Sequence, residues 1–308
     1  MSDPLISIVL CCYNGKQFIK QQMDSLLDQT YPNIEIIISD DASADGTVQI
    51  LEEFRSEQRI QLFFHPANLG SSRNFEFAVG KTHGDFIAFS DQDDIWLPSK
   101  VEKLYSAIGD SYLVYCDSEL VTESGDKLNK KMSDLKRMYA GSETAGFILF
   151  NVVWGHAVMI RRALLQFILP IPPGIPHDIW IAFKAATITG IKYLDMLLTL
   201  YRQHESTATK TVAVRAKSRS MSERYADFKK QLHWIEVIYN HERASRKDFY
   251  NRLFILYQRR QYEKWVWQLF FFLMNHRKKI FMFTRKKWPS QVVEIFKQAK
   301  GVSSKVFF

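Results

Sequence analysis

The first third of the chain alternates short apolar runs with segments of helical period. The runs at residues 5–12, 34–39, 60–64 and 85–90 are rich in β-branched residues and predict buried strands. Strands that alternate with helices indicate a parallel sheet with right-handed crossovers. The pattern therefore predicts an α/β fold with a mostly parallel central sheet flanked by helices. The helices are expected at residues 16–29, 47–55 and 71–79, and a further helix opens at Pro98-Ser99.

After residue 116 the pattern is less regular. The sequence Ser124-Gly125-Asp126 predicts a hairpin turn, and four prolines between residues 170 and 176 exclude regular structure there. A helix rich in Trp, Ile and Phe is expected from His177 onward. The remaining expectations are a polar helix or loop at 132–142, a strand at 147–160 around Trp154-Gly155-His156, and strands at 191–194 and 197–201.

The composition changes beyond Arg202. Residues 205–222 are polar and basic, which predicts a mobile loop. Residues 223–308 are dense in aromatic and basic side chains at helical spacing. We therefore expect one α/β domain at residues 1–204, the loop, and a helical C-terminal region.

The bulk composition is that of a globular protein. Of the 308 residues, 46% are hydrophobic and 24% are charged, which is enough apolar material to fill a core. Lys and Arg exceed Asp and Glu by 41 to 33, so the net charge is +8 and the pI is about 9.2. This balance favours an anionic partner such as a nucleotide, a nucleic acid or a lipid surface, and the excess lies in the C-terminal third.

The three cysteines and the hydropathy indicate a cellular compartment. Cys11, Cys12 and Cys116 lie in apolar runs and cannot all pair with one another, so we expect no disulfide framework. The N-terminal residues lack a signal-peptide pattern. The longest apolar stretch, residues 265–274, is about half of the roughly 20 residues of a membrane span. A cytoplasmic protein is therefore expected.

Three carboxylates follow the buried run that ends at Ser90. Asp91, Asp93 and Asp94 repel one another unless a cation or a hydrogen-bond donor lies among them. The cations Mg²⁺ and Mn²⁺ prefer carboxylate oxygens and share them with substrate phosphates. The cluster therefore predicts a metal and a phosphorylated ligand, and its alternative is a solvated acidic turn that caps the next helix.

Polar side chains also follow the first three predicted strands, and the carboxyl ends of parallel strands meet at one edge of a sheet. Asp41 can accept the imide N–H of uracil or thymine, Tyr13 can pack on the base, and Arg73 can neutralise phosphate. Taken singly, each also suits a turn, a cap or a solvated helix position. The set comprises Tyr13 and Asn14, then Asp40, Asp41 and Asp45, then Asn68, Gly70 and Arg73.

In this combination the chain resembles the family 2 glycosyltransferases, which have the GT-A fold. The resemblance implies a GT-A catalytic domain at residues 1–204, with a donor-binding half at about 1–117 and an acceptor half at about 118–204. The forms D-Q-D-D-I-W, H-D-I-W and Y-R-Q-H are most similar to bacterial rhamnosyltransferases of polysaccharide assembly. The matching segments are S-I-V-L-C-C-Y-N-G at 7–15, I-I-S-D-D-A-S-A-D-G-T at 37–47, N-L-G-S-S-R-N at 68–74, S-D-Q-D-D-I-W at 90–96, H-D-I-W at 177–180 and Y-R-Q-H at 201–204.

The resemblance implies roles in binding the donor. Asp41 would read the pyrimidine and Tyr13 would line the base site. Asp91 would contact the ribose, or the metal through water, and Asp93 would be the direct ligand of Mg²⁺ or Mn²⁺. His204, with Arg202, would meet the diphosphate or the metal. The family often has proline and then threonine or serine where this chain has Cys11 and Cys12, which leaves that part of the base pocket undetermined.

The chemistry of sugar transfer requires a base. A sugar hydroxyl is a poor nucleophile, so a carboxylate must take its proton during attack on the anomeric carbon. Asp178 matches the base position of inverting family members, and its alternative is an N-cap carboxylate. The departing diphosphate gathers negative charge that a metal and nearby cations stabilise. The acceptor-site candidates are Trp154, His156 and Trp180, with plain core packing as the alternative.

The sequence thus predicts a metal-dependent, inverting glycosyltransferase that moves L-rhamnose from dTDP-L-rhamnose to a cell-surface polysaccharide or a lipid-linked glycan. UDP-hexose and UDP-hexosamine donors stay open because thymine and uracil share an imide edge. One rival is a Mg²⁺-dependent phosphohydrolase, in which D-x-D ordinarily follows the first core strand. Another is a non-catalytic sugar-nucleotide-binding subunit. A dinucleotide oxidoreductase is disfavoured because no G-x-G-x-x-G follows the first strand.

The C-terminal region combines apolar surface with clustered cations. The segments 265–274, 276–279 and 285–288 carry most of them. This combination suits peripheral contact with the anionic inner face of the cell membrane. The alternative is packing on the catalytic domain or on a second subunit in a homodimer. Nucleic acid is disfavoured because no known binding motif accompanies the charge.

Overall fold

The computed structural model describes residues 3–204 and 220–302. These residues form two compact units, one of residues 3–142 and 152–204 and the other of residues 143–151 and 220–302. The first unit contains the predicted α/β domain apart from residues 143–151. The predicted basic loop at 205–222 lies outside the described residues up to residue 219.

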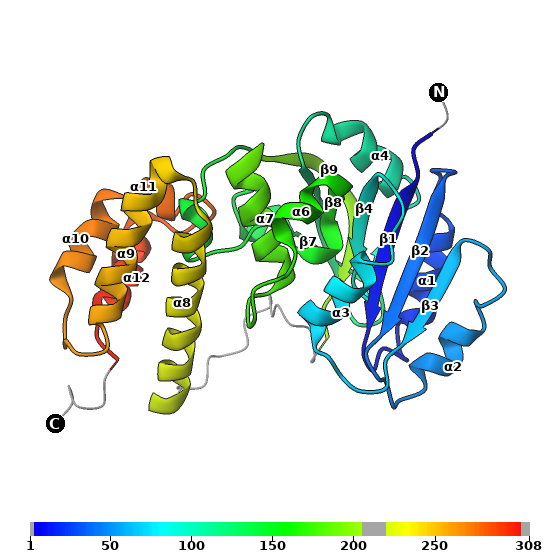
Figure 1. Ribbon diagram of the computed structural model, residues 1–308, viewed down its shortest axis with the longest axis horizontal. Coiled ribbons are helices and arrows are strands. Elements are labelled where there is room, and N and C mark those ends of the chain that lie inside the picture. Colours follow the sequence, from blue (N-terminus) through cyan, green and yellow to red (C-terminus); the bar gives the residue numbers. More distant parts are fainter. Residues whose placement is uncertain (1–2, 205–219, 303–308) are drawn as a thin grey trace. The chain divides into compact units, whose positions relative to one another are not determined.

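Four parallel strands form one half of the sheet in the first unit (Figure 1). Their order is β3-β2-β1-β4, and β1 pairs with both β2 and β4. Apolar side chains on both faces bury β1, as expected of a central strand in a parallel sheet. The predicted strands and helical crossovers are confirmed here. The elements are β1 (Ile6–Cys12), α1 (Ile19–Leu27), β2 (Ile34–Asp40), α2 (Thr47–Glu52), β3 (Ile60–Phe64), α3 (Ser71–Val79) and β4 (Phe86–Ser90).

The other half of the sheet is mixed. The strand β8 pairs antiparallel with both β4 and β6, whereas β9 runs parallel to β6. The short β5 joins β9, and the predicted turn at residues 124–126 connects β6 with β7. The elements are β5 (Ile95–Trp96), α4 (Lys100–Ile108), β6 (Leu113–Val121), β7 (Lys127–Lys131), α5 (Met132–Leu135), η2 (Gly155–Ala157), β8 (Val158–Arg161), η3 (Arg162–Leu164), α6 (Leu165–Ile168), α7 (His177–Ile188) and β9 (Ile191–Arg202).

Two strand predictions in this half need correction. The prediction of one strand at 147–160 is wrong, because the strand begins only at Val158. The chain turns at Gly155, where a Cβ atom would lie 2.9 Å from Nε2 of His177. The strands expected at 191–194 and 197–201 are one strand, β9, whose register against β6 shifts next to Asp117.

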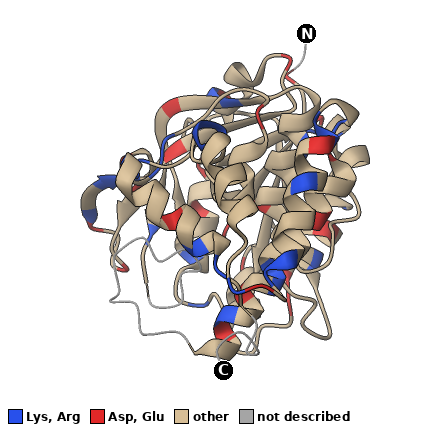
Figure 2. Ribbon diagram, turned by 90° about the vertical axis from the view of Figure 1, so that its left-hand side faces the viewer, with Lys and Arg blue, Asp and Glu red and all other residues tan. Residues whose placement is uncertain are grey.

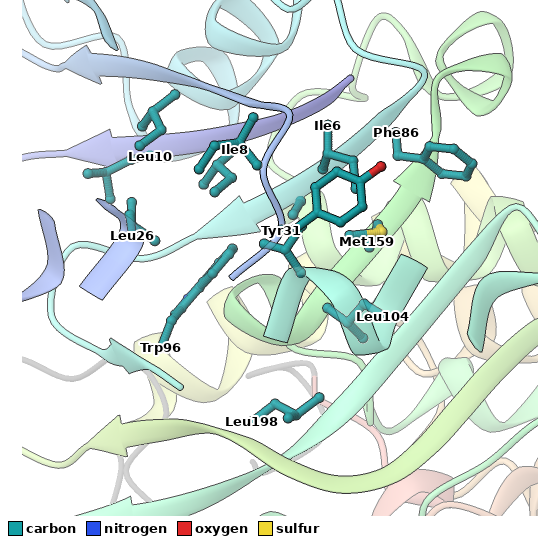
Figure 3. Close-up of a cluster of buried hydrophobic side chains, with 14 of the residues drawn as sticks. Ile6, Ile8, Leu10, Leu26, Tyr31, Phe86, Trp96, Leu104, Met159 and Leu198 are labelled. Atoms are coloured by element: carbon teal, nitrogen blue, oxygen red, sulfur yellow. The ribbon is translucent and has the colours of Figure 1, made fainter. Parts of the chain in front are cut away.

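A hydrophobic core fixes β1 against its neighbours. Ile6, Ile8 and Leu10 alternate along β1 and point into this core (Figure 3). Leu104 of α4 and Trp96 of β5 are buried in the same cluster. Because the middles of the strands are locked in this apolar layer, their polar carboxyl ends are held at one edge of the sheet.

Helices form the second unit, and residues 143–151 pack among them. Thr144 Oγ1 donates a hydrogen bond to Glu242 Oε2 at 2.5 Å, and Trp234 Nε1 donates one to the carbonyl of Phe147 at 2.8 Å. Within the described ranges, no helix is long and apolar enough to cross a bilayer. The elements are η1 (Ala145–Ile148), α8 (Met221–His241), η4 (Ala244–Arg246), α9 (Lys247–Arg259), α10 (Trp267–Asn275), α11 (Arg277–Ile280) and α12 (Trp288–Ala299).

Candidate active site

The strand ends bring the predicted binding residues to one edge of the sheet. The strand β1 lies between β2 and β4, and Cys12 at its end is opposite Asp40 at the end of β2. Tyr13 and Asp91 are the first residues beyond Cys12 and beyond the end of β4. Carboxyl ends of neighbouring parallel strands are where open α/β sheets place ligands.

Asp41 is a buried anchor for the loop after β3. Its Oδ1 and Oδ2 accept hydrogen bonds from the backbone N–H groups of Leu69 at 2.6 Å and Gly70 at 2.9 Å. Its own carbonyl accepts one from Asn68 Nδ2 at 3.2 Å. The carboxylate is 2% exposed and orders the loop. A role in reading a pyrimidine stays a prediction.

Tyr13 and Asn14 are fixed through their neighbours. The N–H of Tyr13 donates to Gln92 Oε1 at 2.8 Å, and its carbonyl accepts from Gln92 Nε2 at 3.0 Å. Asn14, at a φ of 49°, donates its N–H to Ser43 Oγ and accepts from the N–H of Ala44 through Oδ1. The Tyr13 ring remains half exposed, so a planar base can pack on it.

The acidic residues after β4 meet the end of β9. Asp93 Oδ2 lies 2.8 Å from His204 Nε2. Arg202 donates Nε–H to the Asp93 carbonyl at 2.9 Å and its backbone N–H to Asp94 Oδ1 at 3.1 Å. Its guanidinium also donates to Gln21 Oε1 at 2.7 Å and is 2% exposed. These hydrogen bonds from Arg202 therefore hold Asp93 and Asp94 in place.

His156 and Lys100 are buried beside the same carboxylates. His156 Nδ1 lies 3.5 Å from Asp94 Oδ2 and 3.8 Å from Asp91 Oδ2, and its Nε2 lies 2.9 Å from Ser118 Oγ. Lys100 Nζ donates to the carbonyl of His156 at 2.5 Å. Burial lowers the pKa of Lys100 to about 8. Burial, with the Lys100 charge, holds the pKa of His156 well below its usual value, so this imidazole is neutral.

A first cavity of about 380 Å³ lies over the strand ends. Tyr13, Asp41 and Asn68 line one part of it, and Asp91 and Asp93 line another. It therefore offers a half-exposed ring and acidic groups in one concavity. Such a combination suits a nucleotide, with a base at one end and phosphates near the carboxylates.

A second cavity of about 590 Å³ contains Asp178, Arg73, Trp154 and His156 in its lining. Asp178 lies in the first turn of α7, but Pro176 is the N-cap residue of this helix, so the N-cap alternative for Asp178 is not realised. Asp91 lines both cavities and joins them, together with Gly70, Ser71 and Tyr201.

The ionised form of the Asp91 side chain is unfavourable in this position. Burial, followed by the carboxylates of Asp93 and Asp178, raises the pKa of Asp91 to about 7. Burial, followed by the carboxylates of Asp93 and Asp91, also raises the pKa of Asp94. Perturbed carboxylates of this kind gather at functional sites, and a nearby positive charge restores their ionised form.

The cluster fits a divalent cation. Asp91, Asp94 and His156 each offer one ligand atom, and these atoms lie within 4.8 Å of one another. Asp94 Oδ2 is buried and has no hydrogen-bond partner among the described residues. Carboxylate oxygens suit Mg²⁺ and Mn²⁺, and an imidazole nitrogen favours the transition metal. The predicted ligands Asp93 and His204 contact each other, so a cation bound by both would replace their hydrogen bond.

The remaining predicted residues separate into two groups. Trp154 and Arg73 line the second cavity, where Arg73 also pairs with Glu76 at 3.2 Å. Trp180 is in the core, because its Nε1 donates to the carbonyl of Ile168 at 2.7 Å and its side chain is 2% exposed. Trp180 lines neither cavity, so the structure favours the core alternative for it.

Sequence reasoning missed four residues that shape the site. Gln92, inside the D-Q-D-D segment, clamps Tyr13, and its place in a motif was a usable signal. Lys100, Ser118 and Tyr201 surround His156, and the ring of Tyr201 stacks on it at 4.4 Å. Tyr201 begins the Y-R-Q-H segment, which was a usable signal, whereas the contacts of Lys100 and Ser118 join distant segments of the chain and a single sequence gives no signal for them.

Comparison with known proteins shows the family. The model of glycosyl transferase family 2 matches residues 7–169, which is more than half of the chain, and the chain belongs to this family. An uncharacterized glycosyltransferase of Haemophilus influenzae is 35% identical over 127 residues, or 39% of this chain and 51% of that protein. The putative teichuronic acid biosynthesis glycosyltransferase TuaG of Bacillus subtilis is 37% identical over 101 residues, or 32% of this chain and 40% of that protein. The chain thus matches about half or less of the length of these two relatives.

Solved structures agree with the predicted GT-A fold. TarS of S. aureus, residues 1–349 in complex with UDP-GlcNAc, aligns with a TM-score of 0.58 at 19% identity, over 98% of this chain and 82% of that chain. The mannosyltransferase PcManGT of Pyrobaculum calidifontis, in complex with GDP-Man and Mn²⁺, aligns with a TM-score of 0.54 at 16% identity, over 81% and 69% of the two chains. The predicted fold class is therefore confirmed.

The raised pKa of Asp91 predicts a pH-dependent stability in the metal-free protein. An aspartate in the unfolded chain has a pKa of about 3.9, so protonated Asp91 stabilises the fold at low pH. That contribution is lost as pH rises through about 7. Asp91→Asn cannot ionise, so with chelator present its melting temperature should exceed that of the wild type increasingly between about pH 4 and pH 7, and by a steady amount above pH 7.

The control for this measurement is Asp110→Asn, which removes an exposed carboxylate that lines neither cavity. Its melting temperature should follow the wild type at each pH. Identical pH profiles for Asp91→Asn and the wild type would show that the ionised form of Asp91 is not unfavourable in the fold.

Proposed function

We propose that this chain is a metal-dependent, inverting glycosyltransferase that uses a pyrimidine nucleoside diphosphate sugar. The observation that carries the proposal is the position of Asp91, which lines both cavities at the end of β4. A donor in the first cavity would place its diphosphate near Asp91 and Asp93. Its anomeric carbon would then face the second cavity, in which Asp178 lies.

The first cavity supplies the groups that a nucleotide needs. The half-exposed ring of Tyr13 is a stacking surface, and its backbone is clamped by Gln92. Asp41 and Asn68 hold the opposite loop, so the base would enter a preformed slot. Preformed binding groups lose little entropy on ligand binding. In this arrangement Arg202 acts by positioning Asp93 and Asp94, and not by touching phosphate.

Asp178 is the base in this proposal. Its carboxylate lies at the N-terminal turn of α7, where the helix dipole stabilises negative charge. His177 is buried next to it, and its ring lies 3.8 Å from that of Phe75, which fixes the start of the helix. An acceptor hydroxyl in the second cavity would give its proton to Asp178 as its oxygen attacks the anomeric carbon. Attack from the side opposite to the diphosphate inverts that carbon.

A divalent cation would be held by the carboxylates after β4. When bound, it would offset the negative charge of the diphosphate leaving group. Support comes from the fit of Asp91, Asp94 and His156 to a cation, with Asp93 beside them. The likeness in fold to a mannosyltransferase solved with Mn²⁺ is consistent with this part of the proposal.

L-Rhamnose from dTDP-L-rhamnose is the favoured donor, and a cell-surface polysaccharide or lipid-linked glycan is the favoured acceptor. The donor rests on the D-Q-D-D-I-W, H-D-I-W and Y-R-Q-H forms at residues 91–96, 177–180 and 201–204. The acceptor class is supported by the relative named for teichuronic acid biosynthesis. A UDP-hexosamine is the second candidate donor, because a fold neighbour was solved with UDP-GlcNAc.

Thermal-shift measurements should identify the donor. With Mn²⁺ present, dTDP-L-rhamnose at a hundredfold excess over its Kd should stabilise the protein by about 2.7 kcal/mol. UDP-GlcNAc and GDP-mannose serve as comparisons, and each nucleotide is repeated with chelator. A larger shift with UDP-GlcNAc would replace rhamnose by a hexosamine. Equal shifts with and without metal would remove the cation from the proposal.

The base is tested by Asp178→Asn, with Asp110→Asn as the matched carboxylate control. Loss of the proton acceptor should lower sugar transfer by at least about a hundredfold, while the Kd for the nucleotide stays near that of the wild type. The control should keep full activity, because Asp110 lines neither cavity. Transfer by Asp178→Asn at close to the wild-type rate would exclude Asp178 as the base.

A further inference from the structure

Exposed aromatic side chains form one patch on α10 and α12 of the second unit. Trp267 is 51% exposed, Phe271 is 61% exposed and Phe296 is 42% exposed. Trp265 and Phe270 connect them, since their rings lie 4.5 Å and 6.3 Å from that of Phe296. We call these five residues the aromatic patch. Large exposed apolar surfaces of this kind mark interaction sites.

The segment that carries the aromatic patch is basic. Between residues 263 and 300 there are nine Lys and Arg but only two Glu. Figure 2 shows Lys and Arg in blue and Asp and Glu in red. Lys264 precedes Trp265, Lys297 follows Phe296, and both side chains are exposed. The bridge between Trp265 and Lys300 brings a further lysine to the same end of the unit.

Both acidic residues of this segment are already engaged. Glu263 pairs with Arg259 at 2.5 Å, and Glu294 pairs with Lys286 at 3.1 Å. Over the longer described stretch 220–302 there are 18 Lys and Arg against seven Asp and Glu. The aromatic patch therefore belongs to a part of the chain with strong net positive charge.

We propose that the aromatic patch docks on an anionic lipid surface. Indole and phenyl rings partition into the headgroup region of a bilayer, and lysines beside them are attracted by acidic headgroups. Contact through such side chains reaches only the headgroup region, so the proposed docking is peripheral. Peripheral binding strengthens with the apolar area that enters the interface and with attraction to anionic lipids, and the aromatic patch and its lysines supply both.

The charge argues against a second copy of the chain as the occupant. In a twofold dimer built on the aromatic patch, the same surface of both protomers would meet, so the lysines of one patch would be brought close to those of the other. Like charges brought together across an interface cost free energy. An anionic leaflet is complementary to the same surface.

This inference goes beyond the proposed chemistry and does not depend on it. None of the residues in the aromatic patch lines the two cavities of the first unit. Docking would bring the enzyme to the leaflet in which lipid-linked glycan acceptors lie, and it is measured without nucleotide or metal. A failed donor assay would therefore not contradict lipid docking. A failed docking assay would likewise not contradict the proposed donor chemistry.

Vesicle flotation of the purified full chain tests the proposal. Vesicles of phosphatidylcholine alone are compared with vesicles that contain phosphatidylserine in addition. The wild type should float with the anionic vesicles at low salt, stay unbound with neutral ones, and be released by high salt because screening weakens the attraction. A wild type that stays unbound with anionic vesicles at low salt would overturn the proposal.

Paired variants separate the contributions of rings and charges. Trp267→Ala with Phe271→Ala, and separately Lys264→Glu with Lys297→Glu, should each lower the partition coefficient on anionic vesicles by about tenfold or more. The matched controls are Ile255→Ala on α9, which is 49% exposed, and Arg224→Glu with Lys230→Glu on α8. The controls should stay within about twofold of the wild type if docking is local.

Two outcomes contradict the proposal even when the wild type floats. Controls that lose as much binding as the patch variants would show attraction by net charge without a docking surface. A concentration-dependent dimer in sedimentation velocity that Trp267→Ala with Phe271→Ala dissolves would assign the aromatic patch to self-association. Unchanged far-ultraviolet circular dichroism of each variant excludes unfolding as the cause of a loss.

Discussion

The structure of the site depends on the repulsion among three carboxylates at the end of one buried strand. Asp91, Asp93 and Asp94 leave β4 together, and the fold surrounds them with the cationic or hydrogen-bonding groups of Lys100, Arg202, His156 and His204. These groups hold Asp93 and Asp94 in place, but the pKa of Asp91 remains raised to about 7. The pKa of Asp94 is raised as well, and Asp91 lies where the two cavities meet. A cation at that position would relieve the repulsion and could hold a diphosphate in turn, which links the electrostatics of the fold to its proposed chemistry.

The two units differ in the physical character of their surfaces. The first unit concentrates acidic side chains at the sheet edge, with an apolar layer beneath them that fixes the strand ends. The second unit is helical, basic and rich in exposed aromatics. A carboxylate cluster that needs cations suits a phosphorylated donor, and a cationic aromatic surface suits an anionic leaflet. The two proposals therefore draw on opposite charges in separate parts of the chain.

Most elements of the parallel half of the sheet could be predicted from the local hydrophobic pattern. Fewer elements of the mixed half could be predicted in this way. The strand at 60–64 and the helix at 71–79 have the predicted bounds, because apolar periodicity and turn residues agree there. The prediction of a strand at 147–160 failed because Val152, Val153 and Trp154 are buried without belonging to a strand. The carboxylates, Tyr13 and Asp178 were visible as motif residues. The buried lysine Lys100 and its contact with His156 were not, since that contact joins residues 56 positions apart.

The central claim is that the carboxylates after β4 hold a nucleoside diphosphate through a cation, between two cavities that share Asp91. The most direct measurement is a crystal structure of the protein with a pyrimidine nucleoside diphosphate and Mn²⁺, read by the anomalous signal of manganese. The account predicts the base beside Tyr13 and a manganese peak among Asp91, Asp93 and Asp94. A nucleotide bound elsewhere, or bound beside Tyr13 with no manganese at these carboxylates, would contradict it.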